Sequence, residues 1–195
     1  MPRVLLVNNF YTRKSMQELK SAIAVQGAAV TVADKREVSA RLFNSFDGVV
    51  LSGSRAMLSD RATRTKYSSE TEAAVDTSTH VLGICFGHQL LGAAFGSRVQ
   101  KTERPTRKYV RTRVLDQSGL FAGLSETISV FESHYEVVET TPRPFKLLAE
   151  SESSRVSAMK HRNRPIWGIQ FHPERNSERN PDGRTILRNF IGQLR

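Results

Sequence analysis

The single cysteine of this 195-residue chain, Cys85, lies in a sequence setting that could make its thiol reactive. Glycine stands two residues before it, at Gly83, and two residues after it, at Gly87. The apolar run 81–84 predicts a buried strand, and residues 87–95 follow a helical pattern. A nucleophile at such a tight turn is typical of a nucleophile elbow, where glycine leaves room that a Cβ would fill. The N-terminus of the following helix would favour the thiolate.

A lone cysteine is more often a buried structural residue than a nucleophile. A nucleophilic role for Cys85 is favoured only if the chain also provides a base for its thiol. His172 is the best candidate of five histidines, because it ends the apolar run 166–171 and precedes Pro173 and Glu174. Proline fixes the turn, and a nearby carboxylate can orient an imidazole and stabilise its charged form. Cys85, His172 and Glu174 therefore form a candidate set of nucleophile, base and orienting residue. We expect other histidines to pack or to lie at the surface: His80, His88 and His161. The sequence contains no His, Cys, Asp and Glu spacing typical of metal ligands.

Apolar runs alternate with helical patterns in the first half of the chain and predict an α/β fold. Buried strands are predicted at 3–8, 30–34, 47–51 and 81–84, and helices at 14–26, 68–78, 87–95 and 183–194. The second half is richer in strand patterns, at 108–115, 127–131, 145–149, 155–160 and 165–171. Residues 35–45 are expected to form a polar helix or turn, and 54–67 an exposed loop. This order predicts a mostly parallel central sheet with helices on both faces and additional antiparallel strands in the second half. Because sites in such sheets lie at the carboxyl ends of the strands, one crevice could hold Gly53, Cys85 and His172.

Composition limits the class of protein. The length fits one domain over residues 1–195, and no apolar run is long enough to span a membrane. The first apolar stretch is too short for a signal peptide, and one cysteine allows no internal disulfide, so we expect a cytoplasmic protein.

The formal charge is +10, and basic side chains are concentrated in residues 98–113. An acidic partner or nucleic acid could use this basic face, although a solvated surface is the commoner origin of such a run. Nucleic acid is the less expected partner, because no aromatic interleaving or nucleic-acid motif accompanies the run.

The segment Gly83-x-Cys85-x-Gly87-His88-Gln89, followed later by Gln170-Phe171-His172-Pro173-Glu174, resembles the class I (triad) glutamine amidotransferases. The resemblance covers essentially the whole chain and implies the flavodoxin-like fold of that family. It implies a glutaminase that converts L-glutamine to glutamate and ammonia through a γ-glutamyl thioester on Cys85. It implies no cofactor and no metal.

The same resemblance implies a role for each matching residue. His172 would protonate the departing ammonia and then activate water, and Glu174 would orient His172. The backbone N–H groups of Gly53 and Phe86 would form the oxyanion hole. The substrate would be bound by Gln89 and by a pocket lined by Ser133, His134 and Tyr135.

Some positions depart from the family pattern. The oxyanion loop usually reads Ser-Gly-Gly-Pro, whereas this chain has Ser-Gly-Ser-Arg at residues 52–55, and Phe86 stands where leucine is commoner. Within the family the chain is most similar to the free-standing glutaminase subunit of GMP synthase, which implies ammonia delivery to an ATP-dependent synthetase on a separate chain. The alternatives are a stand-alone γ-glutamyl hydrolase or peptidase with the same triad, and a non-catalytic regulatory relative. The basic face at 98–113 could dock an acidic surface of the partner.

Overall fold

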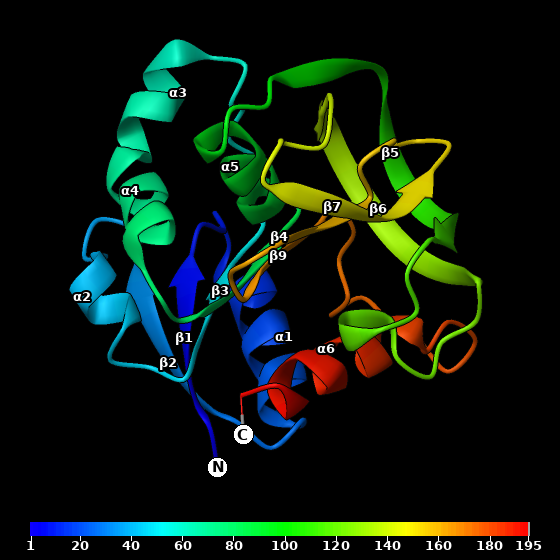
Figure 1. Ribbon diagram of the computed structural model, residues 1–195, viewed down its shortest axis with the longest axis horizontal. Helices are drawn as coiled ribbons and strands as arrows, with labels where there is room; N and C mark the ends of the chain where they lie inside the picture. The colour runs from blue at the N-terminus through cyan, green and yellow to red at the C-terminus, as the bar shows by residue number, and fades with distance from the viewer. Residues whose placement is uncertain (195) are drawn as a thin grey trace.

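In the computed structural model, which describes residues 1–194, the chain forms a nine-stranded sheet in the order β2-β1-β3-β4-β9-β8-β7-β5-β6 (Figure 1). The parallel half of the sheet consists of β1 (Arg3–Asn8), β2 (Ala29–Asp34), β3 (Gly48–Leu51), β4 (His80–Ile84) and β9 (Ile166–Ile169). The antiparallel half consists of β5 (Val99–Val114), β6 (Thr127–Val138), β7 (Phe145–Ser151) and β8 (Ala158–His161). Strand β9 joins the halves, since it is parallel to β4 and antiparallel to β8. The predicted fold class is confirmed.

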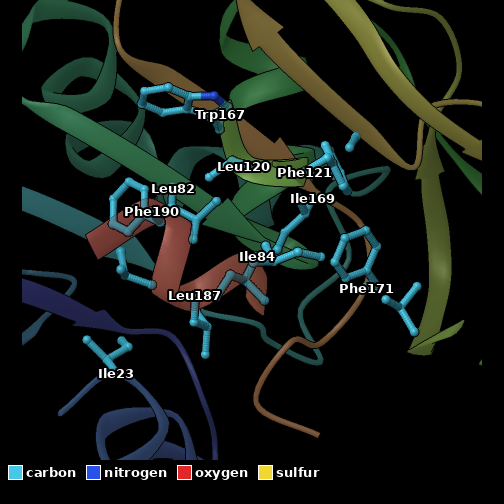
Figure 2. Packing of buried hydrophobic residues seen from close by; sticks show 14 of the residues in the cluster. Ile23, Leu82, Ile84, Leu120, Phe121, Trp167, Ile169, Phe171, Leu187 and Phe190 are labelled. Carbon is cyan, nitrogen blue, oxygen red and sulfur yellow. The ribbon is translucent and has the colours of Figure 1, made fainter. Parts of the chain in front are cut away.

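Helices cover both faces of the parallel half because its strands alternate their side chains between two apolar layers. On one face, α1 (Arg13–Ala24), α6 (Asp182–Gly192) and the short 3₁₀ turn η1 (Gly119–Phe121) pack against residues such as Leu82 and Ile84 (Figure 2). On the other face, α2 (Ala40–Phe43), α4 (Ser68–Asp76) and α5 (Phe86–Ala94) pack on the neighbouring side chains, such as Val49 and Val81. The strands are therefore apolar at nearly every position and end together at one edge.

Three of the sequence expectations need correction. Strand β6 continues to Val138, well beyond the predicted end at residue 131. The segment 54–67 is not a continuous exposed loop, because it contains the helix α3 (Arg61–Lys66). The Asp60 side chain caps this helix by accepting a hydrogen bond from the Thr63 N–H. The last residue of the segment, Tyr67, is buried. Strand β5 begins at Val99, well before the predicted start at residue 108. Its first part is almost entirely exposed, so no alternation of apolar and polar residues marked it.

No helix of residues 1–194 is both long enough and apolar enough to cross a membrane.

Candidate active site

The backbone of Cys85 is strained in the way that a nucleophile elbow requires. Cys85 directly follows β4 and has a φ of 51° and a ψ of −99°, and it is the only non-glycine residue of the described chain with a positive φ. The flanking glycines make the turn possible. A Cβ at Gly83 would lie 2.6 Å from the carbonyl carbon of Gly87, and one at Gly87 would lie 2.7 Å from the Cβ of Leu51. Strain of this kind is kept where the surroundings impose it, which favours a functional role for the thiol.

His172 is held beside the thiol by contacts on both its main chain and its ring. Strands β4 and β9 pair in register, and the Cys85 N–H donates to the Ile169 carbonyl at 2.8 Å, so the ends of both strands meet. The N–H of His172 donates to the Phe131 carbonyl at 2.7 Å. Ring atom Nδ1 lies 2.8 Å from Oε1 of Glu174, and these side chains are only 6% and 3% exposed.

The charges around His172 favour its protonated form. Burial lowers the pKa of His172, but the negative charges of Glu174 and Cys85 outweigh burial and raise this pKa to about 10. The imidazole is therefore a proton donor at neutral pH, placed between the sulfur of Cys85 and the carboxyl group of Glu174. The sequence prediction that these three residues come together is consistent with this geometry.

Gly53 and Phe86 provide backbone N–H groups next to the triad. Gly53 follows β3, and a Cβ at this position would lie 2.9 Å from Cε1 of His172, so only glycine fits against the ring. Phe86 begins α5 directly after Cys85. Within residues 1–194, neither the N–H of Gly53 nor that of Phe86 donates a hydrogen bond. These groups are free to bind an oxyanion.

The unusual residues after Gly53 adopt a defined conformation. Ser54 accepts a hydrogen bond from the Ala56 N–H at 3.1 Å, which closes a short turn. The buried carboxylate of Glu136, on β6, accepts the N–H groups of Leu58 at 2.6 Å and Ser59 at 3.0 Å. These bonds fix a loop that lacks the usual second glycine and proline. No local sequence signal indicates this role of Glu136, although it shares one face of β6 with Glu132 and His134.

A cavity of about 470 Å³ opens at the thiol and contains Cys85, Gln89 and His172 in its wall. The segment 133–135 forms another part of the wall, together with Phe10 and Tyr11, which follow β1. Basic side chains also line it: Arg55, Arg107 and Arg175. A cavity of this size with a cationic wall suits a small molecule that carries a carboxylate.

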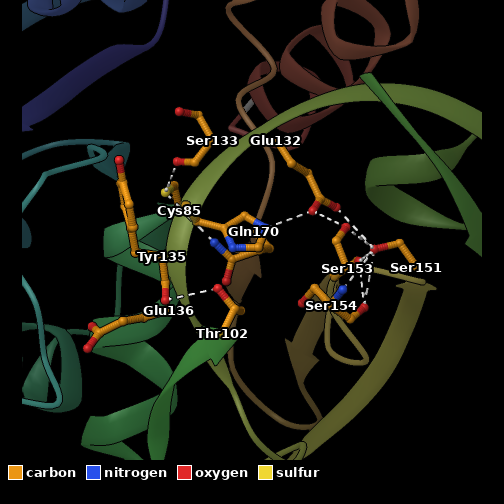
Figure 3. A network of polar contacts seen from close by, with 12 residues as sticks. Cys85, Thr102, Glu132, Ser133, Tyr135, Glu136, Ser151, Ser153, Ser154 and Gln170 are labelled. Carbon is orange, nitrogen blue, oxygen red and sulfur yellow. Dashed lines mark hydrogen bonds and ion pairs between the residues drawn. The ribbon is translucent and has the colours of Figure 1, made fainter. Parts of the chain in front are cut away.

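The predicted substrate-binding side chains differ in their exposure and in whether other residues already bind them (Figure 3). Tyr135 is 61% exposed, and the Ser133 carbonyl lies 3.6 Å from the sulfur of Cys85. The imidazole of His134, in contrast, is 1% exposed and bonded to the buried Glu132 at 2.8 Å. His134 can therefore face the cavity only with its main chain.

Amide side chains behind the thiol form a further polar group. Gln89 donates to the Glu136 carbonyl at 2.6 Å and to Gln170 at 3.3 Å, so only its own oxygen is left for a ligand. Gln170 in turn donates from Nε2 toward the Cys85 sulfur at 3.7 Å. Gln170 belongs to the motif of residues 170–174, but no local sequence signal indicates its contact with the thiol.

The remaining histidines lie outside this arrangement. Burial lowers the pKa of His88 to about 3, so this ring is neutral inside the core. His80 stacks on Trp167 with ring centres 6.0 Å apart, and His161 packs against Phe95 and Phe145. Among the described residues, no group of three or more His, Cys, Asp or Glu side chains could hold a metal ion.

Comparisons with known proteins agree with this geometry. The family model described as "Glutamine amidotransferase class-I" matches residues 6–194. A subunit of the glutamine-hydrolysing GMP synthase of Thermococcus kodakarensis is 44% identical over 110 residues, and its counterpart in Thermoplasma acidophilum is 33% identical over 156 residues. The first alignment covers 56% of this chain and 57% of the relative, and the second covers 80% and 76%. This chain thus matches little more than half the length of the first relative.

Solved structures give the same result for the fold. A Thermoplasma acidophilum protein assigned as a GMP synthase subunit superposes with a TM-score of 0.88 at 29% identity, covering 100% of this chain and 94% of that one. A glutamine amidotransferase of Thermotoga maritima superposes with a TM-score of 0.78 at 16% identity, covering 99% and 97%. The second likeness concerns the fold alone.

Proposed function

This chain belongs to the class I glutamine amidotransferase family, and we propose from that premise that it hydrolyses L-glutamine and passes the ammonia to a synthetase on a separate chain. The observation that carries the proposal is the strained, glycine-flanked Cys85 beside the buried His172–Glu174 pair. Our best candidate for the acceptor reaction is GMP synthesis, since relatives from several archaea are subunits of glutamine-hydrolysing GMP synthases. We place the reaction in the cytoplasm, on the argument that a chain with one cysteine forms no internal disulfide.

In the first half of the reaction the Cys85 thiolate attacks the side-chain amide carbon of glutamine. The carbonyl electron pair moves to oxygen, and the resulting oxyanion accepts hydrogen bonds from the N–H groups of Gly53 and Phe86. His172 gives its proton to the amide nitrogen as the carbon–nitrogen bond breaks. The products are ammonia, a γ-glutamyl thioester on Cys85 and a neutral His172.

In the second half, the neutral His172 accepts a proton from water while the oxygen of that water attacks the thioester carbon. The same N–H groups stabilise the second oxyanion, and its collapse releases glutamate and the Cys85 thiolate. His172 ends protonated, so the enzyme returns to its starting state. The role of Glu174 is to stabilise the imidazolium and to hold its Nδ1–H, as the 2.8 Å contact allows.

We assign substrate recognition to Gln89 and to the segment 133–135 on β6. Only the oxygen of Gln89 is available, because its nitrogen is bonded to Glu136 and Gln170. The main chain at 133–135 would contact the α-amino and α-carboxylate ends of glutamine. The arginines in the cavity wall supply the positive charge that the carboxylate end requires.

The basic face of residues 98–113 is our candidate docking surface for the synthetase. All seven of its basic side chains are exposed: Arg98, Lys101, Arg104, Arg107, Lys108, Arg111 and Arg113. Only Arg113 forms an ion pair within residues 1–194, with Glu150. Because Arg107 also lines the cavity, the face continues to the mouth of the site where ammonia would leave. An acidic partner surface would be complementary to this charge.

The test of the activity is glutamine hydrolysis by the wild type and by Cys85→Ala, with and without a GMP synthase synthetase subunit, ATP and its nucleotide substrate. We expect Cys85→Ala to lose about three orders of magnitude or more of the rate while unfolding at the temperature of the wild type. Stimulation of the wild type by the complete synthetase mixture supports an amidotransferase subunit. Hydrolysis that never responds to the mixture favours a stand-alone hydrolase, and an active Cys85→Ala protein would refute the mechanism.

The docking proposal has its own test. Arg107→Glu with Lys108→Glu should weaken synthetase binding by about tenfold or more, and added salt should weaken wild-type binding. The control pair is Arg184→Glu with Arg188→Glu, which makes the same charge change at exposed positions of α6. Equal effects from both pairs, or binding that ignores salt, would exclude this face.

A further inference from the structure

A second buried carboxyl, that of Glu70 on α4, lies close to the loop of Gly53 but takes no part in the triad. Glu70 is only 1% exposed. Its Oε1 accepts a hydrogen bond of 2.8 Å from Nδ2 of Asn9, the residue that follows β1 and is 3% exposed. Within residues 1–194, Oε2 of Glu70 and Oδ1 of Asn9 have no hydrogen-bond partner. Glu70 and Asn9 are thus hydrogen-bonded to each other, and each side chain also has one oxygen without a hydrogen-bond donor among the described residues.

A single proton would satisfy both unpartnered atoms. If Oε2 of Glu70 carries a hydrogen, it can donate to Oδ1 of Asn9, and carboxyl and amide then form a closed ring of two hydrogen bonds. Burial strongly favours this state: it raises the pKa of Glu70 to about 8, although the bond from Asn9 and the charge of Lys35 work against the rise. The carboxyl is therefore neutral at pH 7.

Among residues 1–194, no basic side chain forms an ion pair with Glu70 that would neutralise its charge. Lys35, just after β2, is the charged group that acts on Glu70, and its Nζ donates to the Tyr67 hydroxyl at 2.9 Å. Tyr67, at the start of α4, packs its ring on Phe86 with centres 4.6 Å apart. From the end of β1 the contact is the uncharged Asn9. A proton on the carboxyl is the remaining way to keep this site neutral.

Asn9 connects this pair to the proposed oxyanion loop. Its backbone N–H donates to the Ser52 hydroxyl at 2.8 Å, and Ser52 immediately precedes Gly53. The next residue, Phe10, places its ring 3.1 Å from where a Cβ of Gly53 would lie. Asn9 is therefore bonded to the residue before Gly53, and its neighbour Phe10 packs beside Gly53.

We propose that Glu70 is a positioning residue whose protonated carboxyl locks Asn9 and, through Ser52, holds the N–H of Gly53 in place for the oxyanion. This proposal rests on the proposed function, since the oxyanion role of Gly53 belongs to that function. Glu70 touches neither the substrate nor the reacting atoms. It acts on the rate only through the loop.

The experiment compares Glu70→Gln with Glu70→Leu, and uses Glu72→Gln as the matched control at an exposed position of α4. Glutamine can form both ring hydrogen bonds without a titrating proton, whereas leucine forms neither. The kcat and KM of glutamine hydrolysis are measured in the presence of the synthetase subunit. The unfolding temperature is measured from pH 5 to pH 9 and does not depend on any activity.

We expect Glu70→Gln to keep at least half of the wild-type kcat, and Glu70→Leu to lose about tenfold or more of kcat with KM changed less than threefold. A raised carboxyl pKa means that Glu70 makes wild-type stability decline as pH rises from the ordinary value of 4.5 to about 8, and Glu70→Gln should remove this contribution while that of His172 at higher pH remains. Glu72→Gln should keep it.

Wild-type kcat in Glu70→Leu would overturn the positioning role, as would a Glu70→Gln protein that is as impaired as Glu70→Leu. An unchanged pH dependence of unfolding in Glu70→Gln would overturn the protonated pair, whether or not the leucine variant folds. A wild type that hydrolyses no glutamine even with its partner would refute the proposed function and the loop role together. The unfolding comparison would then still decide on the protonated pair by itself.

Discussion

Replacing Glu174 by glutamine tests how the charge of one carboxylate sets the working range of the proposed enzyme. Glutamine has nearly the size of glutamate and keeps an oxygen that can accept the Nδ1–H of His172. The substitution removes the negative charge from a side chain that is 3% exposed. Geometry is preserved, and the electrostatic contribution is lost.

The size of the effect follows from the surroundings of His172. Burial lowers the pKa of His172, and the charges of Glu174 and Cys85 together bring it from 6.5 to about 10. The charge of Glu174 raises the pKa of His172 more than the charge of Cys85 does. If Glu174 supplies half of the net rise in the pKa of His172, removing its charge destabilises the imidazolium by between about 2 and 3 kcal/mol, and this pKa falls to about 8. At pH 9 the variant should therefore lose about tenfold more activity than at pH 7.

Two pH profiles measure this shift. The first is kcat/KM for glutamine from pH 6 to pH 10.5, where the basic limb should move from about pH 10 in the wild type to about pH 8 in the variant. The second is alkylation of the thiol by iodoacetamide, which reports Cys85 alone because the chain has one cysteine. Because the pKa of His172 is raised on folding, its stabilising effect is present below pH 6.5 and lost as pH rises toward 10. The unfolding free energy should therefore decline less over this range in Glu174→Gln.

Glu178→Gln is the matched control, since it removes the same charge from an exposed side chain four residues away. Its pH profiles should coincide with those of the wild type. If Glu174→Gln loses the same factor at every pH, Glu174 only orients the ring, and the electrostatic reasoning is refuted.

Further predictions concern the parts that position the site. Gly87→Ala should destabilise the fold by about 2–3 kcal/mol in urea unfolding and abolish activity, because the new methyl group meets the backbone oxygen and the Cβ of Leu51; wild-type stability would contradict the packing described for the elbow. Glu136→Gln should cost about 1–2 kcal/mol and raise KM for glutamine, because weakened hydrogen bonds release the loop after Gly53; an unchanged KM would mean that this loop does not bind substrate. Glu150→Gln removes a solvent-exposed ion pair with Arg113 and should change the unfolding free energy by less than about 1 kcal/mol.

The sequence predicted the parts of the site whose signals are local. Cys85 with its glycines, and His172 with Pro173 and Glu174, each lie within a few residues of a strand end. The rule that parallel strands end at one edge then brings them together.

The supporting contacts could not be predicted in this way, because they join residues far apart in the chain. Glu136 binds the N–H of Leu58 across 78 positions, and Asn9 binds Glu70 across 61. Periodicity indicates which face of a strand is buried, but not which loop a buried carboxylate meets. His134 was predicted from the family pattern as a substrate contact. Only the tertiary structure reveals that its ring is hydrogen-bonded to Glu132.

The place of β9 in the sheet has a consequence for folding. This strand comes late in the chain, yet it lies in the interior of the sheet, between β4 and β8. Cys85 receives its proton-transfer partner only when β9 has been inserted, a contact of long sequence separation that forms slowly in most proteins. We therefore expect a newly made chain to carry an unactivated thiol until its last strand is in place. The order of assembly itself would then protect the nucleophile from premature chemistry.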